Sequence, residues 1–273
     1  MQYDPAKATT PKIFNRRTFA SSWPVSESVQ VLFREGVLSG AGNHTTMDYD
    51  TILTIGFEGL IDRINRRAAC LSPDEPDVDE KRHFLEALRI VAEGYISFCR
   101  RYADHALTLA RETKDKARRC ELEMIARNCL QVPARPPTSF WEACQAVWFC
   151  FFFLPDAPGR VDQYLYPFYR LEVEQNTIEP DSARELLSCL WIKYFEFAGA
   201  QAGVSAHQHL TLGGVKPDGS DASNDLTSLC LEVTEELRLH RPQVGLRWNR
   251  NTPPKLLKRA VRVLRTHSGN PDF

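Results

Sequence analysis

Histidines in two short stretches could act chemically on a small molecule. His44 lies in GAGNHTTMDYD, a glycine-flanked stretch before an expected helix, where a neutral imidazole can donate and accept hydrogen bonds. A lone loop histidine is otherwise usually a solvated or capping residue. His207 and His209 form an H-x-H that would place both rings on one face of a strand, a spacing compatible with metal ligation. Because no third ligand is in view, we expect no metal site.

A second group of polar residues lies in the charged turn GRVDQY, at the start of Gly159–Glu196. We interpret Arg160 and Asp162 as a buried or half-buried polar pair that orients the turn, with the aromatic side chains that follow packing around it. Asp48, just before an expected helix, is interpreted as the helix N-cap rather than as a general base. We therefore expect no catalytic residue among them.

The elements that must position these side chains are mostly helices. Apolar residues and helix-favouring composition predict helices over about 48–68, 81–112, 114–129, 141–154, 180–194, 224–239 and 255–265. Ser139 and Glu142 fit a capping box at the start of the fourth helix. Two β-favouring stretches, Leu210–Leu212 and Val244–Arg247, flank the sixth helix in a strand–helix–strand order. The sequence predicts an α/β fold that is predominantly helical.

Composition narrows the class of protein. The chain has 273 residues, with 34 basic and 35 acidic side chains and a formal net charge of −1. This balance gives no electrostatic footprint for nucleic acid or for an anionic membrane, so we expect a small-molecule substrate or a protein partner. The most apolar run, AVWFCFFFL, is far shorter than the roughly 20 residues that span a bilayer. Eight scattered cysteines, without a C-x-x-C, suit reduced thiols in a cytoplasm.

Four sequence blocks follow one another along the chain. They are GAGNHTTMDYDTILTIGFEGLIDRI at 40–64, RPPTSFWEACQAVWF at 135–149, GRVDQYLYPFYR with LLSCLWIK inside 159–196, and LTLGGVKPDGSDASNDLTSLCLEV to PQVGLRWNRNTPPKLL at 210–257. Their order and spacing resemble those of the glycyl radical enzymes, the superfamily of pyruvate formate-lyase. The resemblance implies a partial pyruvate formate-lyase-like domain over 33–273 and leaves 1–32 without a clear counterpart. It also implies the N-terminal portion of a ten-stranded barrel with its outer helices.

The resemblance carries expectations about the site. His44 matches a family histidine that lines the substrate pocket in several relatives, so we expect it to bind substrate. The family's cysteine loop, "G-C-V-E", and its radical-bearing glycine loop, "R-V-(S/A)-G-Y", do not occur in these 273 residues. The chain is therefore expected to be an N-terminal portion that binds no cofactor, with the glycyl radical in the missing C-terminal part.

Two functions remain open at this point. In the first, the chain is part of an anaerobic, cytoplasmic glycyl radical enzyme that performs radical elimination or C–C or C–N cleavage on a small molecule. Such an enzyme would be a homodimer and would need a radical S-adenosylmethionine activating enzyme as a partner. In the second, the chain is a truncated or degenerate helical scaffold without catalysis. The direct run FFFLPDAPGR, where many relatives insert a polar loop, favours the second function.

Overall fold

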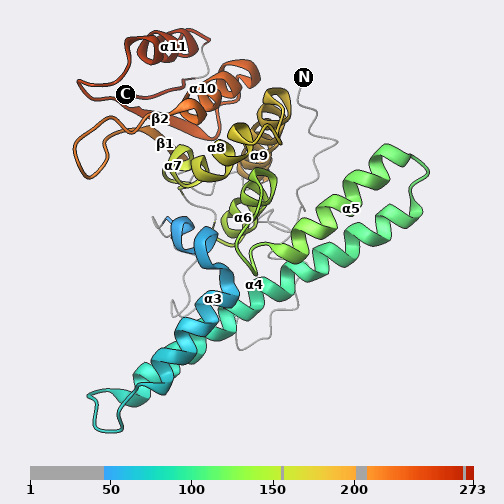
Figure 1. Cartoon of the computed structure of the whole chain (residues 1–273), viewed down its shortest axis with the longest axis vertical. Coiled ribbons are helices and arrows are strands. Elements are labelled where there is room, and N and C mark those ends of the chain that lie inside the picture. Colours follow the sequence, from blue (N-terminus) through green and yellow to red (C-terminus); the bar gives the residue numbers. More distant parts are fainter. Residues whose placement is uncertain (1–45, 155–156, 201–207, 267–268) are drawn as a thin grey trace. The chain divides into compact units, whose positions relative to one another are not determined.

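The computed structural model describes residues 46–154, 157–200, 208–266 and 269–273 (Figure 1). The predicted N-terminal segment 1–32 and His44 lie outside these residues. The described part is mostly helical and forms two compact units. The helical unit comprises residues 47–153 and 167–179, and the strand-bearing unit comprises Thr46, 154–166 and 180–273.

The helical unit is built from successive helices that pack on their chain neighbours. They are α3 (Tyr49–Ala69), α4 (Val78–Glu112), α5 (Lys116–Gln131), α6 (Phe140–Phe153) and most of α8 (Tyr166–Glu174). Helix α4 lies alongside both α3 and α5, as Figure 1 shows. Small buried side chains, among them Ala103 and Ala106 of α4 and Ala126 of α5, let the α4 and α5 backbones approach closely. The predicted helices are confirmed, with ends that differ by up to three residues except at α9 (Pro180–Ala200), which ends six residues later than predicted.

Two helix starts test the capping predictions. Asp48 is the N-cap of α3, as predicted, and its carboxylate accepts from the Thr51 N–H at 3.1 Å. Ser139 accepts from the Glu142 N–H at 3.1 Å, which is one half of the predicted capping box. The other half is wrong, because the Glu142 carboxylate reaches one residue further back and accepts from both the N–H and the hydroxyl of Thr138.

Helix α3 is interrupted at Gly56, whose φ of +66° favours glycine. The interruption leaves the next two N–H groups without partners inside the helix. They donate instead to Pro133 O and Ala134 O, both at 2.9 Å. A Cβ atom at Gly56 would lie 2.4 Å from Ala134 O, so only glycine allows this close approach. The periodic spacing of apolar residues does not reveal this kink.

The strand-bearing unit contains a two-stranded parallel sheet. Strands β1 (His209–Gly213) and β2 (Gln243–Arg247) are joined by helix α10 (Asp225–Leu237), which confirms the predicted strand–helix–strand order. The unit also contains α7 (Val161–Tyr164), α9 (Pro180–Ala200) and α11 (Pro254–Leu264). Helix α10 contacts α7, α9 and α11. Helices α7 and α8 were not predicted.

Two further chain segments extend this sheet as isolated parallel bridges. Gly159 pairs with Leu210 on one edge, where its carbonyl accepts from the Thr211 N–H at 2.8 Å. Asp272 pairs with Gly245 on the other edge, and its carbonyl accepts from the Leu246 N–H at 2.7 Å. Four segments therefore run parallel in this unit. The ten-stranded barrel stays a prediction.

Within the described ranges, none of the helices combines the length and apolar content needed to cross a bilayer.

Candidate functional site

The two faces of the parallel sheet differ in character. Side chains alternate between faces along a strand, and those of Leu210, Leu212, Val244 and Leu246 are at most 1% exposed. A crossover helix packs on one face of the sheet it connects, so we assign this apolar face to α10. The opposite face carries His209, Thr211, Gln243 and Arg247, and we call these four residues the open face.

Geometry confirms which side His209 occupies. A Cβ atom at Gly245 would lie 2.5 Å from His209 Nε2, so the imidazole lies across the neighbouring strand over a residue that has no side chain. His209 and Arg247 are exposed, and neither the imidazole nor the guanidinium has a hydrogen bond or ion pair within the described ranges. Gln243 donates through Nε2 to Asp272 Oδ2 at 2.6 Å. Within the part of the chain that the structure describes, the open face therefore carries an unpaired guanidinium, an imidazole without a hydrogen bond, and an amide that is hydrogen-bonded to Asp272.

The GRVDQY turn is anchored to the end of β1. Arg160 donates through Nη2 to Gly213 O at 2.8 Å, and Asp162 accepts from Gly213 N at 2.8 Å. The hydroxyl of Thr227 on α10 donates to the same carboxylate oxygen at 2.5 Å. Asn224 donates through Nδ2 to Asp162 O at 2.8 Å. The predicted polar pair is thus real, but its two members act through Gly213, and no ion pair joins them in the described structure.

Asp162 is a structural carboxylate rather than a catalytic one. Its residue is 0% exposed, and burial raises its pKa although the hydrogen bonds from Thr227 and Gly213 act in the opposite direction. Oδ1 of Asp162 and Nε of Arg160 are buried with no hydrogen-bond partner in the described part of the chain. A carboxylate without access to solvent or to a cavity cannot exchange a proton with substrate, so it fixes the turn to the strand.

Asp221 shows the opposite shift close to the same strand ends. Burial acts to raise its pKa, but hydrogen bonds to its carboxylate from Ser223, Asn249 and Thr252 outweigh burial and lower the pKa. Asn249 also donates to Gly214 O at 2.9 Å. This network holds the loop after β1 against the loop after β2. It fixes the end of the open face at which Arg247 lies.

The cysteines form no reactive centre in the described structure. Cys99, Cys129, Cys144, Cys150 and Cys230 are buried and pack as small apolar side chains. Burial raises the pKa of the Cys129 thiol to about 12 and that of Cys99 and Cys150 further. No group of three or more His, Cys, Asp or Glu that could hold a metal ion occurs among the described residues.

The sequence as a whole matches a known family. The model of the pyruvate formate lyase-like family matches residues 26–273. The chain belongs to this family of glycyl radical enzymes. The resemblance inferred from the four sequence blocks is therefore confirmed. The domain boundary predicted at residue 33 stays a prediction.

Named members of the glycyl radical enzymes align over most of the chain. Isethionate sulfite-lyase of Oleidesulfovibrio alaskensis is 37% identical over 242 residues, which cover 82% of this chain and 29% of that protein. Trans-4-hydroxy-L-proline dehydratase of Clostridioides difficile is 33% identical and covers 98% of this chain and 36% of that protein. A glycyl radical enzyme of Archaeoglobus fulgidus superposes with a TM-score of 0.74 at 33% identity, over 87% of this chain and 33% of that structure. The chain thus spans about a third of these proteins.

The candidate site was only partly visible in the sequence. The H-x-H pattern marked His209, but His207 lies outside the described residues, as does His44. Arg247 and Gln243 were not singled out, although alternation along a predicted strand places them on the same side as Gly245. The contact of Asp162 with Thr227 joins residues 65 positions apart and has no local signal.

Proposed function

We propose that this chain forms the N-terminal part of a glycyl radical enzyme that performs radical elimination or C–C or C–N cleavage on a small molecule. The observation that carries this proposal is the family match over residues 26–273. The similar proteins include a sulfite-lyase and a dehydratase, both of which break a bond by elimination. Because the chain spans about a third of these relatives, the reaction belongs to the whole protein.

In this proposal the open face forms one wall of the substrate pocket. Parallel sheets are normally covered on both faces. Here one face is apolar and buried, while the other is polar and carries Arg247, which has no partner among the described residues. A guanidinium can pair with a carboxylate or sulfonate through two parallel hydrogen bonds. Isethionate and hydroxyproline, the substrates in the two relatives' names, each carry such a group. We therefore propose a substrate with an anionic group that faces Arg247.

His44 is proposed to bind a polar group of the substrate. In the complete protein, His44→Ala should lower turnover by about tenfold or more, because a buried polar group that loses its partner costs about 1–3 kcal/mol. Installation of the radical should be unchanged. Arg247→Gln should instead raise KM for an anionic substrate, with Arg250→Gln in the following loop as the matched control. Unchanged kinetics for His44→Ala would assign that histidine to loop structure alone.

The complete enzyme is proposed to be an anaerobic, cytoplasmic homodimer with a radical S-adenosylmethionine activating enzyme as its partner. The activated protein would supply a glycyl radical that oxidises a cysteine, and both groups lie in sequence motifs that these 273 residues do not contain. The residues of this chain would bind and orient substrate and exclude water. The test is to incubate the complete gene product anaerobically with an activating enzyme and record its electron paramagnetic resonance spectrum.

A glycyl doublet together with sulfite release or dehydration of an added substrate would support the enzyme proposal. The alternative, a non-catalytic helical scaffold, is favoured by the direct FFFLPDAPGR run before the GRVDQY turn. A complete gene product that folds but acquires no radical signal would support the scaffold. The two proposals therefore give opposite spectra in one experiment.

A further inference from the structure

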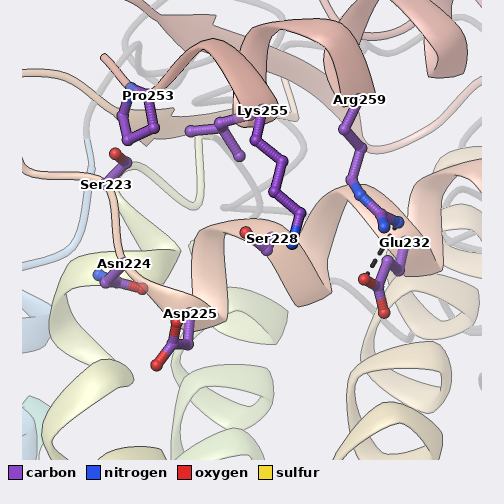
Figure 2. Close-up of a pocket in the computed structure, with 9 residues that line it drawn as sticks. Ser223, Asn224, Asp225, Ser228, Glu232, Pro253, Lys255 and Arg259 are labelled. Atoms are coloured by element: carbon purple, nitrogen blue, oxygen red, sulfur yellow. Dashed lines mark ion pairs between the residues drawn. The ribbon is translucent and has the colours of Figure 1, made fainter. Parts of the chain in front are cut away.

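A charged groove runs along α10 and α11 in the strand-bearing unit. We define it by Ser228, Glu232 and Glu235 of α10 with Lys255, Arg259 and Arg262 of α11. Hollows of about 310, 510 and 190 Å³ adjoin one another there, and all three are lined by Arg259. Figure 2 shows the first hollow, into which Lys255 and Arg259 reach from α11 toward Ser228 and Glu232 on α10. The hollows together form an elongated site rather than a single pocket.

The carboxylates at the centre of this groove are already neutralised. Arg259 Nη1 lies 3.0 Å from Glu232 Oε1, and Arg262 Nε lies 3.1 Å from Glu235 Oε1. Arg184 Nη2 lies 3.6 Å from the other Glu232 oxygen. These pairs hold the two helices and α9 in register. Two other carboxylates of the linings, Asp225 and Glu236, have no ion pair within the described ranges.

Unpaired cations lie on both sides of these ion pairs. Lys255 and Lys258 on α11, and Arg238 after α10, have no ion pair within the described ranges. The linings of the three hollows contain six cationic and four acidic side chains, whereas the whole chain carries a formal net charge of −1. Helix α11 has no acidic residue. The excess of positive charge therefore lies in the third hollow, whose lining of Lys255, Lys258, Arg259 and Arg262 contains no acidic residue, whereas charges balance in the other two linings.

The physical character of the groove selects among possible occupants. Sites for small molecules are mostly apolar and bury most of the ligand, but these hollows are lined by charged side chains along two helices. A basic amphipathic helix can lie on a membrane, but the apolar stripe of α11, Leu256, Ala260 and Val263, is buried. An extended acidic segment fits an elongated charged surface of this kind, because its carboxylates can meet successive cations along α11.

We propose that the α10–α11 groove binds an extended acidic segment of a partner protein, whose carboxylates meet Lys255, Lys258 and Arg238. Complementary charge steers such a segment to the groove and makes the association sensitive to salt. The ion pairs between Arg259 and Glu232 and between Arg262 and Glu235 form its rigid floor. This inference concerns a surface separate from the open face and is independent of the proposed catalysis.

The test uses the full 273-residue chain and a fluorescent ten-residue oligoglutamate peptide as the probe. Fluorescence anisotropy should show saturable binding at low salt, and raising the salt to about 0.3 M should weaken it by about tenfold or more. The double variant Lys255→Glu, Lys258→Glu should weaken binding by at least about tenfold, because each change replaces an attraction with a repulsion. Circular dichroism checks that the variant is folded.

Lys116→Glu at the exposed start of α5 is the matched control, and it should change the affinity by less than about twofold. Equal weakening by Lys116→Glu and by the double variant would overturn the proposal, since it would show non-specific attraction. Binding of heparin or of phosphatidylserine vesicles in preference to oligoglutamate would overturn it too. So would self-association of the chain that the double variant abolishes, because the occupant would then be a second copy.

Discussion

Replacing Thr227 by valine tests the buried network that anchors the GRVDQY turn. Valine keeps the shape of threonine at a position that is 0% exposed, so the change removes only the hydroxyl. That hydroxyl accepts from Asn224 N at 2.9 Å and donates to Asp162 Oδ2 at 2.5 Å. Asp162 would keep a single donor, the Gly213 N–H, because its other oxygen already lacks a partner in the described structure.

The expected loss of unfolding free energy in Thr227→Val follows from the two hydrogen bonds that the variant lacks. A neutral hydrogen bond contributes about 0.5–1.5 kcal/mol and one to a charged group about 1.5–3 kcal/mol. Thr227→Val should therefore lower the free energy of unfolding by about 2–4.5 kcal/mol. Urea titration of the purified chain, followed by far-ultraviolet circular dichroism, measures this loss as a lower midpoint with an unchanged slope.

The matched control is Thr234→Val in the same helix. Thr234 is 2% exposed, and its hydroxyl donates to Cys230 O at 2.8 Å and accepts from Trp191 Nε1 at 3.2 Å, so it also makes two contacts. Both partners are uncharged, and we expect a loss of about 1–3 kcal/mol. If Thr227→Val costs no more than Thr234→Val, the contact with the Asp162 carboxylate contributes nothing beyond an ordinary hydrogen bond, and our account of the turn is wrong.

Three further predictions follow from burial and backbone geometry. The pKa of Asp162 is raised in the folded protein, so folding favours its protonated form. Its contribution to the free energy of unfolding should therefore fall as pH rises above the usual value of 3.8. Urea titrations from pH 4 to 8 should show this fall in the wild type and not in Asp162→Asn. Gly56→Ala should destabilise the chain by about 3 kcal/mol or more. A Cβ atom at Gly94 would meet no atom within 4 Å, so Gly94→Ala should stabilise the chain by up to about 1 kcal/mol. Similar thermal midpoints for the two variants would contradict the clash of a Cβ atom at Gly56 with Ala134 O. The exposed Cys70 should react quickly with a thiol reagent in the native state, and the buried Cys129 only on unfolding; mass spectrometry of partly labelled protein distinguishes the two.

Local sequence signals predicted the elements well and their tertiary contacts poorly. Periodicity located the long helices and both strands to within a few residues, because amphipathic spacing is a property of neighbouring positions. Helix α7 was missed because four residues are too few to show a period. Asp162 appeared as part of a local pair, but its partners Gly213 and Thr227 lie 51 and 65 residues further along the chain. No spacing rule reaches across such distances.

The arrangement of the open face also depends on contacts that local sequence signals do not predict. The H-x-H pattern suggested a shared role for two histidines, whereas His209 lies over Gly245 on the neighbouring strand. The sequence placed both residues in strands, but only the register, which pairs Thr211 with Gly245, brings them together. Strand register depends on long-range pairing and turn geometry, so this part of the site needed the structure.

The separation of Asp162 from its partners also sets an order of events on the ribosome. Helices α3, α4 and α5 contact their neighbours in sequence, so they can pair as soon as each helix has been synthesised. The GRVDQY turn must instead wait until Thr227 has been made, which at about 5–20 residues per second takes several seconds. During that time the Asp162 carboxylate is ionised in water. Its burial, with the raised pKa that follows, therefore comes late, and the strand-bearing unit closes over a carboxyl group whose ionised form is disfavoured there.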